Sequence, residues 1–199
     1  MKKIAFLIVL GSVAAASQAV TFSNIVIGKP ASFSNPSVTP IGNAITFMFP
    51  DALVGDSLLL RAANVNIQYD ANSGVNAFAV TAFVNLGAAA LGSGKVLFTE
   101  MVFELDSMGN EVGGPIGTIS HVFDSTTSPI FAGQINLSRQ VTNLRAKKAF
   151  TLFAPNSSAF DLAGIQTVNQ SVKVVPEPAT IAALGAGVAF MARRRRKSA

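Results

Sequence analysis

Residues 95–106 read KVLFTEMVFELD, and this stretch decides the fold class of the chain. Leu97 and Met101 stand at odd-numbered positions together with other apolar residues, whereas Glu100 and Glu104 stand at even-numbered positions. We call each such set of alternate positions a parity of the strand. Successive side chains of a β-strand point to opposite faces of the sheet. The pattern therefore predicts a half-buried strand, with Leu97 and Met101 in the core and the two glutamates in water.

The sequence after this stretch predicts a β-hairpin. Residues 106–111 read DSMGNE, which is a cluster of turn-forming residues. Beyond it an apolar parity resumes at Ile119, His121 and Phe123. Two period-two segments joined by a turn are typical of an antiparallel strand pair.

Similar period-two segments recur through residues 20–174, separated by short clusters of Gly, Asn, Ser and Pro. Helical periodicity is nearly absent, although a helix around residues 138–148 stays open. Many short strands at intervals of about a dozen residues predict an all-β fold, a single β-sandwich of jelly-roll or immunoglobulin-like type. A closed barrel is the alternative. The further strands are predicted at residues 41–49, 65–69, 76–86, 135–137, 150–153 and 168–174.

The first residues of the chain have the order of a secretory signal peptide. Two lysines follow Met1, residues 4–13 are apolar, and residues 14–19 read AAASQA. The small residues predict cleavage after Ala19. We therefore expect an N-terminal signal helix at 1–19 and an exported domain at 20–174, with a retained membrane helix as the alternative.

The end of the chain, residues 175–199, combines three physically different parts. VPEPAT at 175–180 contains two prolines that oppose a helix interior, residues 179–192 are apolar, and an arginine run follows. This order resembles the PEP-CTERM sorting tail, which an exosortase recognises in Gram-negative bacteria. The resemblance implies a recognition motif of Pro176, Glu177 and Pro178 and a stop signal of Arg193, Arg194, Arg195 and Arg196.

The apolar part of this tail predicts a short transmembrane helix. Residues 179–192 would span about 21 Å as an α-helix, whereas the hydrocarbon core of a bilayer is about 30 Å thick. The arginines are expected to stay on the cytoplasmic side. The resemblance implies transient anchoring in the inner membrane, processing by the exosortase, and delivery to the cell surface or extracellular matrix. An ordinary single-pass anchor is the alternative.

The basicity of the chain comes from its two ends. Of the 15 Lys and Arg residues, seven lie in residues 1–19 and 175–199, where only one of the 10 acids lies. The body keeps eight bases against nine acids and is close to neutral, so nucleic-acid binding is not expected. We interpret the one local excess as a solvated loop or a charged strand edge, and it consists of Arg139, Arg145, Lys147 and Lys148. Contact of this group with an anionic polysaccharide or the membrane surface is the alternative.

The residues that catalysis and cofactor binding require are scarce. The chain has no Cys and a single histidine, His121, and it has neither a Gly-x-Ser-x-Gly elbow nor a phosphate-binding glycine loop. Glu100 and Glu104 would lie about 13 Å apart along one extended strand, too far for a catalytic carboxylate pair, although either could pair with Glu111 across the hairpin. We therefore predict a non-enzymatic protein without a cofactor, and a matrix-acting hydrolase is the alternative class.

Two oxygen-rich turns are weak candidates for a calcium site. Asp70 and Asn72 precede Gly74, and Asp106 and Asn110 lie in the predicted hairpin turn. Both turns lack the longer acidic series of an EF-hand loop. Asx turns, in which the side chain caps its own backbone, explain these residues without a metal.

Carbohydrate binding is a further alternative role. The chain has 15 Phe, one Tyr and no Trp. Phenylalanines on the apolar parity of their strands are predicted to fill the core rather than to stack on sugars, and they include Phe47, Phe49, Phe103 and Phe123. The resemblance of the tail implies producers that secrete exopolysaccharide, so we expect the protein to associate with that polymer.

Overall fold

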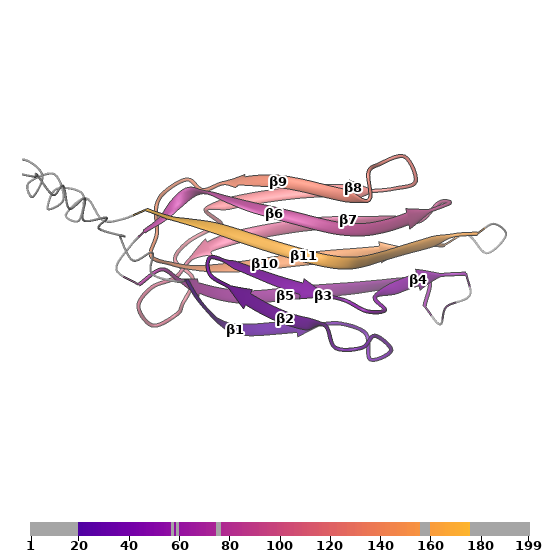
Figure 1. Cartoon of the computed structure of the whole chain (residues 1–199), viewed down its shortest axis with the longest axis horizontal. Helices are drawn as coiled ribbons and strands as arrows, with labels where there is room; N and C mark the ends of the chain where they lie inside the picture. Colours follow the sequence, from indigo (N-terminus) through magenta and orange to yellow (C-terminus); the bar gives the residue numbers. More distant parts are fainter. Residues whose placement is uncertain (1–19, 57, 59, 75–76, 156–159, 176–199) are drawn as a thin grey trace, which may run out of the picture.

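The computed structural model describes residues 20–56, 58, 60–74, 77–155 and 160–175, which form an all-β sandwich (Figure 1). The predicted fold class is confirmed. The predicted signal helix with Ala19 lies outside the described residues, and so do the Pro-Glu-Pro motif, the tail helix and the arginine run. In the part of the chain that is described, no helix has the length and hydropathy needed to cross a bilayer.

Two sheets build the sandwich, and we call them the five-stranded and the six-stranded sheet. The five-stranded sheet has the spatial order β1 (Thr21–Gly28), β5 (Ala62–Asn72), β10 (Asn143–Phe153), β7 (Lys95–Glu104) and β8 (Gly117–Phe123). The six-stranded sheet has the order β2 (Ser37–Ile41), β3 (Ala44–Met48), β11 (Leu162–Val175), β6 (Ala77–Leu91) and β9 (Ile130–Asn136), and β4 (Leu53–Gly55) also pairs with β11.

The last two strands of the chain lie in the middle of the sheets. β10 pairs with β5 on one side and β7 on the other, and β11 lies between β3 and β6. All pairings between these strands are antiparallel, and Figure 1 shows the strands running along the long axis of the molecule. Side chains of β10 and β11 that point inward therefore meet near the centre of the core.

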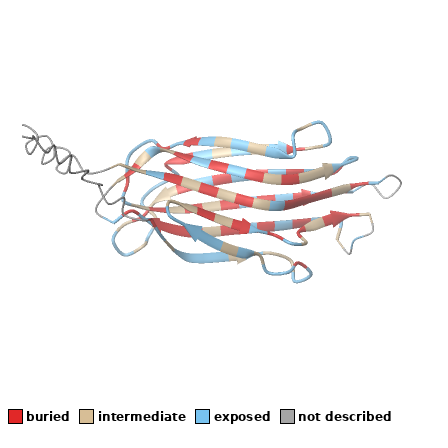
Figure 2. Ribbon diagram, viewed as in Figure 1, coloured by how far each residue is buried: buried red, intermediate tan, exposed pale blue. Residues whose placement is uncertain are grey.

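The core fills the space between the sheets, as the alternating buried and exposed bands of the strands show (Figure 2). Phe47, Phe49 and Phe123 are buried, as predicted. Phe103 differs, because it is only half-buried, with the Lys147 ammonium 4.7 Å from its ring centre. The rings of the core bury large apolar areas and supply much of the driving force for folding.

The predicted face assignment in β7 is wrong. The parity that includes Phe98 and Glu100 is buried, whereas Leu97 and Met101 are 46% and 37% exposed. Both parities carry apolar residues, so periodicity alone does not choose between them. The inner face accepts Glu100 because Lys148 of the neighbouring strand compensates its charge inside the core.

Two element boundaries also differ from the predictions. The helix left open around residues 138–148 does not form, because Asn143–Phe153 is strand β10. The single strand predicted at 41–49 is interrupted by a turn at Gly42 and Asn43, because Ile41 ends β2 and β3 begins at Ala44. Gly42 has a φ of 57°, a conformation that glycine adopts without a Cβ penalty, and Ile41 before it is 72% exposed. The predicted hairpin is confirmed as the antiparallel pair β7 and β8.

Candidate functional site

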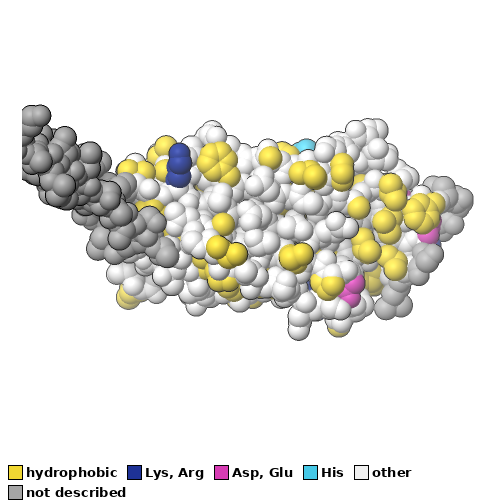
Figure 3. All heavy atoms as spheres, in the orientation of Figure 1, with side chains coloured by type: hydrophobic (Ala, Val, Ile, Leu, Met, Phe, Trp, Pro, Cys, Tyr) yellow, Lys and Arg dark blue, Asp and Glu magenta, His cyan; other side chains and the backbone are white. Residues whose placement is uncertain are grey.

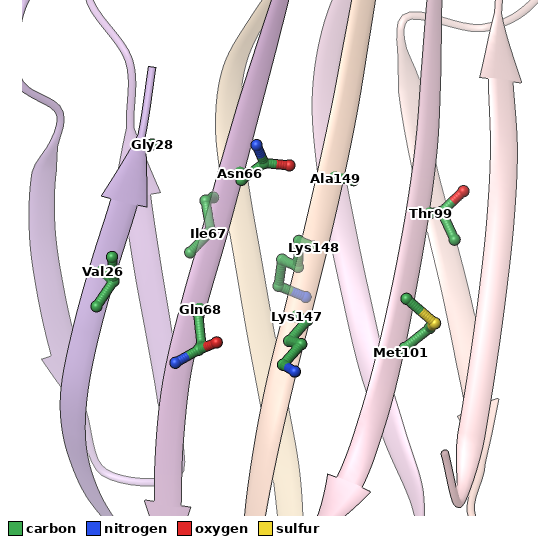
Figure 4. Close-up of a pocket in the computed structure, with 10 residues that line it drawn as sticks. All are labelled: Val26, Gly28, Asn66, Ile67, Gln68, Thr99, Met101, Lys147, Lys148 and Ala149. Atoms are coloured by element: carbon green, nitrogen blue, oxygen red, sulfur yellow. The ribbon is translucent and has the colours of Figure 1, made fainter. Parts of the chain in front are cut away.

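A groove of about 450 Å³ lies on the outer face of the five-stranded sheet (Figure 4). Residues from β1, β5, β10 and β7 line it, so it runs across the strands rather than along one of them. The lining residues labelled in Figure 4 are Val26, Gly28, Asn66, Ile67, Gln68, Thr99, Met101, Lys147, Lys148 and Ala149.

The strand register explains why the sheet is hollowed at this place. Gly28 is paired with Asn66, Asn66 with Ala149, and Ala149 with Thr99, so these four residues form one row across four strands. Ala149 and Thr99 have small side chains and Gly28 has none, so the row forms a low floor. Gly28 contributes because it has no side chain at all, although a Cβ there would meet only ordinary contacts with Asn66.

The adjacent row is taller and forms one wall of the groove. Val26 is paired with Gln68, Gln68 with Lys147, and Lys147 with Met101. The wall thus combines two apolar side chains with an amide and an ammonium group. Such a mixture of flat apolar surface and hydrogen-bonding groups is typical of ligand-binding clefts.

The positive charge of Lys147 is compensated at the wall. Its Nζ lies 2.6 Å from Oε1 of Glu111, and a hydrogen bond from Lys147 is the largest of the effects that lower the pKa of Glu111. Arg145 lies 3.3 Å from the same Oε1 and donates to Asp70 through Nε at 2.6 Å and through a terminal nitrogen at 2.9 Å. The hydrogen bond to Asp70 is the main cause of the raised pKa of Arg145.

The local excess of basic residues is therefore not a free cationic patch. β10, which carries three of the four, is a central strand, so the interpretation as a loop or strand edge is wrong for them. Figure 3 shows the opposite face of the sandwich, formed by the six-stranded sheet, where charged side chains are few. Each basic residue of the group has an acidic partner, and the pairs are Arg139 with Glu104, Arg145 with Asp70, Lys147 with Glu111, and Lys148 with Glu100.

Directly beneath the groove, the core contains a polar cluster of Lys148, Glu100 and Gln170. The Lys148 ammonium donates to Oε2 of Glu100 and, at 2.5 Å, to Oε1 of Gln170. All three residues are buried, and they come from β10, β7 and β11. The cluster therefore connects the two sheets of the sandwich.

Aromatic rings surround this polar cluster. The Lys148 Nζ lies 6.0 Å from the ring centre of Tyr69 and 5.9 Å from that of Phe98. Burial raises the pKa of the Glu100 carboxyl and lowers the pKa of the Lys148 ammonium, because both charged forms lose their hydration. Burial also raises the pKa of Tyr69. Burial thus opposes the charged form of each group, whereas the contact between Lys148 and Glu100 acts in the opposite direction for these two residues.

The sequence contains a signal for this cluster, but the prediction assigned the wrong parity of β7 to the core and therefore missed it. Glu100 shares its parity with the buried Phe98, and Lys148 shares its parity with the buried Phe150. Gln170 likewise shares its parity with buried valines of β11. A polar residue on the apolar face of each of three strands indicates three buried polar side chains, and the arrangement of the strands brings them into contact.

Hydrogen bonds from other protein groups hold the side chains of both calcium candidates. Asp70 accepts from Arg145 through both carboxylate oxygens, and Asn72 Oδ1 accepts from the Gly74 backbone N–H at 2.6 Å. Asp106 Oδ1 accepts from the backbone N–H groups of Met108 and Asn110, both at 2.8 Å. Among the described residues no group of three or more His, Cys, Asp or Glu could hold a metal ion.

The remaining candidates for chemistry lie apart from one another. His121 stacks on Phe131 with ring centres 4.0 Å apart and meets Phe123 edge-on at 4.6 Å. Glu100 points into the core, whereas Glu111 binds Lys147 on the outer face. These two carboxylates therefore lie on opposite sides of the sheet and share no cleft.

Residues 174–197 match the family model of the PEP-CTERM protein-sorting motif. The chain ends in a PEP-CTERM sorting motif. The match contains the predicted Pro176, Glu177 and Pro178 and the arginine run, and it begins one residue before the predicted boundary. This motif implies export, anchoring of the C-terminus in a membrane before processing, and processing by an exosortase.

Comparison with solved structures finds remote likenesses to the body. A structure of TmCBM61 in complex with β-1,4-galactotriose has a TM-score of 0.36 and 10% identity, covering 78% of this chain and 90% of that one. The enzymatically active domain of bacteriophage CBA120 tailspike protein 4 has a TM-score of 0.34 and 15% identity over 77% of this chain and 20% of that one. A structure described as "CBM4 structure and function" has a TM-score of 0.30 and 10% identity, covering 77% of this chain and 86% of that one. Curated protein sequences give no match.

Proposed function

We propose that this protein is a non-enzymatic component of the cell surface or extracellular matrix, and that it binds exopolysaccharide in the groove of the five-stranded sheet. The sorting motif supports an extracellular destination, reached through transient anchoring in the inner membrane of a Gram-negative cell. The groove is the feature of the body that suits a long polymer.

The shape of the groove carries the proposal. Its floor is a row of mostly small residues that crosses four strands, so an extended chain can lie across the sheet. Asn66 and Gln68 offer amide groups, Thr99 offers a hydroxyl, and Met101 offers an apolar edge. Sugar rings present the same combination of hydroxyl groups and apolar faces.

The lining of the groove also supports a binding role rather than a catalytic one. None of the described residues that line it is Asp, Glu or His. Hydrolysis of a glycosidic bond commonly uses two carboxyl groups beside the scissile bond. The nearby Glu111 is held by Lys147 at the rim. The ammonium of Lys147 is compensated by this contact, so the groove suits a neutral or weakly anionic polymer.

Affinity electrophoresis tests this function directly. The full chain is run in native gels that contain exopolysaccharide extracted from the producing cells, and we expect its migration to be retarded in proportion to the polymer concentration. Ala149→Phe raises the floor of the groove and is expected to abolish the retardation. Ala132→Phe is the matched control, because Ala132 is an exposed alanine of β9 in the other sheet. Equal retardation of both variants contradicts the assignment of the groove.

A further inference from the structure

The buried cluster of Lys148, Glu100 and Gln170 has the composition and contacts of a site for amide-bond formation. Lys148 supplies an amine, Gln170 supplies a carboxamide, and Glu100 supplies an acid–base group in contact with the amine. We propose that the folded protein joins Lys148 to Gln170 by an intramolecular isopeptide bond, with Glu100 as the catalytic residue. The bond would connect the central strands of the two sheets.

The separation of the reacting atoms supports the reaction. The Lys148 Nζ lies 2.5 Å from Oε1 of Gln170. The carbonyl carbon Cδ is one C=O bond further, so Nζ lies at most about 3.7 Å from it. Reacting atoms held at about 3 to 3.5 Å gain effective molarities on the order of 10⁵ to 10⁸ M over free reactants. A small shift of one side chain is sufficient to reach that distance.

The reaction balances without any further reagent. The neutral amine of Lys148 attacks Cδ of Gln170, and a new C–N bond forms. The bond from Cδ to Nε2 then breaks, and Nε2 leaves as ammonia. Glu100, protonated at the start, donates its proton to the leaving nitrogen and takes one from the attacking nitrogen. One primary amide and one amine become one secondary amide and one ammonia, with no change in oxidation state.

Glu100 is suitably placed for both proton transfers. Its Oε2 contacts the Lys148 ammonium, so the proton that must leave the amine has an acceptor at hand. Its Oε1 is buried and has no hydrogen-bond partner among the residues that the structure describes, so this oxygen is available for the leaving nitrogen. The pKa shifts of the pair agree with this role, because burial favours the neutral amine and the protonated carboxyl.

The surroundings protect the product. The rings of Tyr69 and Phe98 flank the ammonium, and the three side chains of the cluster are buried, so little water reaches the amide. The chain contains no Cys, so it forms no disulfide. An amide between β10 and β11 would give this exported sandwich the covalent link between sheets that a disulfide often provides.

Peptide mapping of the full chain by mass spectrometry tests the proposal. No Lys or Arg lies between 148 and 173, and trypsin does not cleave after an acylated lysine. The bond therefore predicts a tryptic peptide of residues 148–173 whose mass is lower by one ammonia than that of the linear peptide. Fragmentation of this peptide is expected to yield no separated backbone fragments from breaks between Lys148 and Gln170, because both lie in one ring.

Three variants separate the chemistry from the fold. Glu100→Gln keeps the shape of the side chain but removes the acid–base group, and Lys148→Arg removes the primary amine. Both are expected to lose the ammonia-deficient peptide, whereas the neighbouring Lys147→Arg retains it. The wild-type map decides the question even if a core variant fails to fold.

Other products overturn the proposal in distinguishable ways. A linear wild-type peptide beginning at Ala149 shows that Lys148 is free and that the cluster is only a buried ion pair. A loss of one water, with Lys148 linked to Glu100, shows that the carboxyl and not the amide is the acceptor. Retention of the ring in Glu100→Gln shows that Glu100 is not the catalytic residue.

Discussion

Lys148 and Glu100 are direct cross-strand partners on β10 and β7, and both side chains point into the core rather than to water. Two charges removed from water lose several kcal/mol each of hydration, and their mutual attraction returns this only when the geometry is good. Here Gln170 provides a third polar contact from the opposite sheet. The central position of these strands makes the pair costly to disturb.

Replacement of Lys148 by Met should destabilise the protein strongly. The variant keeps the volume of the side chain but leaves the buried carboxyl of Glu100 and the buried carboxamide of Gln170 without their polar partner, for which we expect a loss of about 3 to 5 kcal/mol in the free energy of unfolding. Lys147→Met is the control, because its contact with Glu111 is partly exposed and is expected to contribute about 1 kcal/mol or less. Urea unfolding of both variants measures the difference. Equal losses contradict the special role of the buried pair.

The strands of this sandwich could be predicted from period-two patterns, but the face that each strand buries could not always be. In β7 the sequence offers apolar residues on both parities, and the acid on one of them suggested water. Glu100 is nevertheless buried, because Lys148 compensates its charge, and Lys148 lies 48 positions further along the chain. Such compensation depends on strand pairing, which a local pattern does not contain.

Arg145 should contribute more to stability than Arg139, although both form ion pairs with acids. Arg145 binds both carboxylate oxygens of the buried Asp70, whereas Arg139 meets Glu104 in a more exposed pair. We expect Arg145→Ala to cost about 1 to 3 kcal/mol and Arg139→Ala about 1 kcal/mol or less. Chemical unfolding midpoints measured in parallel test this order, and a reversed order contradicts it.

The contribution of Asp106 to the stability of the protein should be lost in acid. Hydrogen bonds from Asn110, first of all from its backbone N–H, lower the pKa of the Asp106 carboxyl in the folded state. A lowered pKa gives stability that is present above the ordinary pKa of aspartate and is lost as the pH falls through the lowered value. Asp106→Asn keeps an oxygen acceptor for the turn but does not titrate, so its melting temperature should decline less between about pH 6 and about pH 2. An identical acid decline in both proteins contradicts this.

The groove could not have been located from the sequence, because its residues are ordinary members of four separate strands. Gly28, Asn66, Ala149 and Thr99 become one row only through the register of three strand pairs. The sorting tail is the opposite case, because its motif, apolar run and arginines are consecutive in the chain. Its information is local, and the match at residues 174–197 agrees with the predicted tail almost to the residue.

Processing of the tail leads to a prediction about the mature protein. An exosortase substrate is expected to lose its arginine run, so mass spectrometry of the protein from producing cells should find no peptide that contains Arg193 to Arg196. Glu177→Ala disrupts the recognition motif and should leave the full tail in the membrane fraction. Ser198→Ala is the control, because residue 198 lies beyond the matched motif. A mature wild-type protein that still ends at Ala199 contradicts processing and favours a permanent anchor, since an uncut tail keeps the cytoplasmic arginines that hold it in the bilayer.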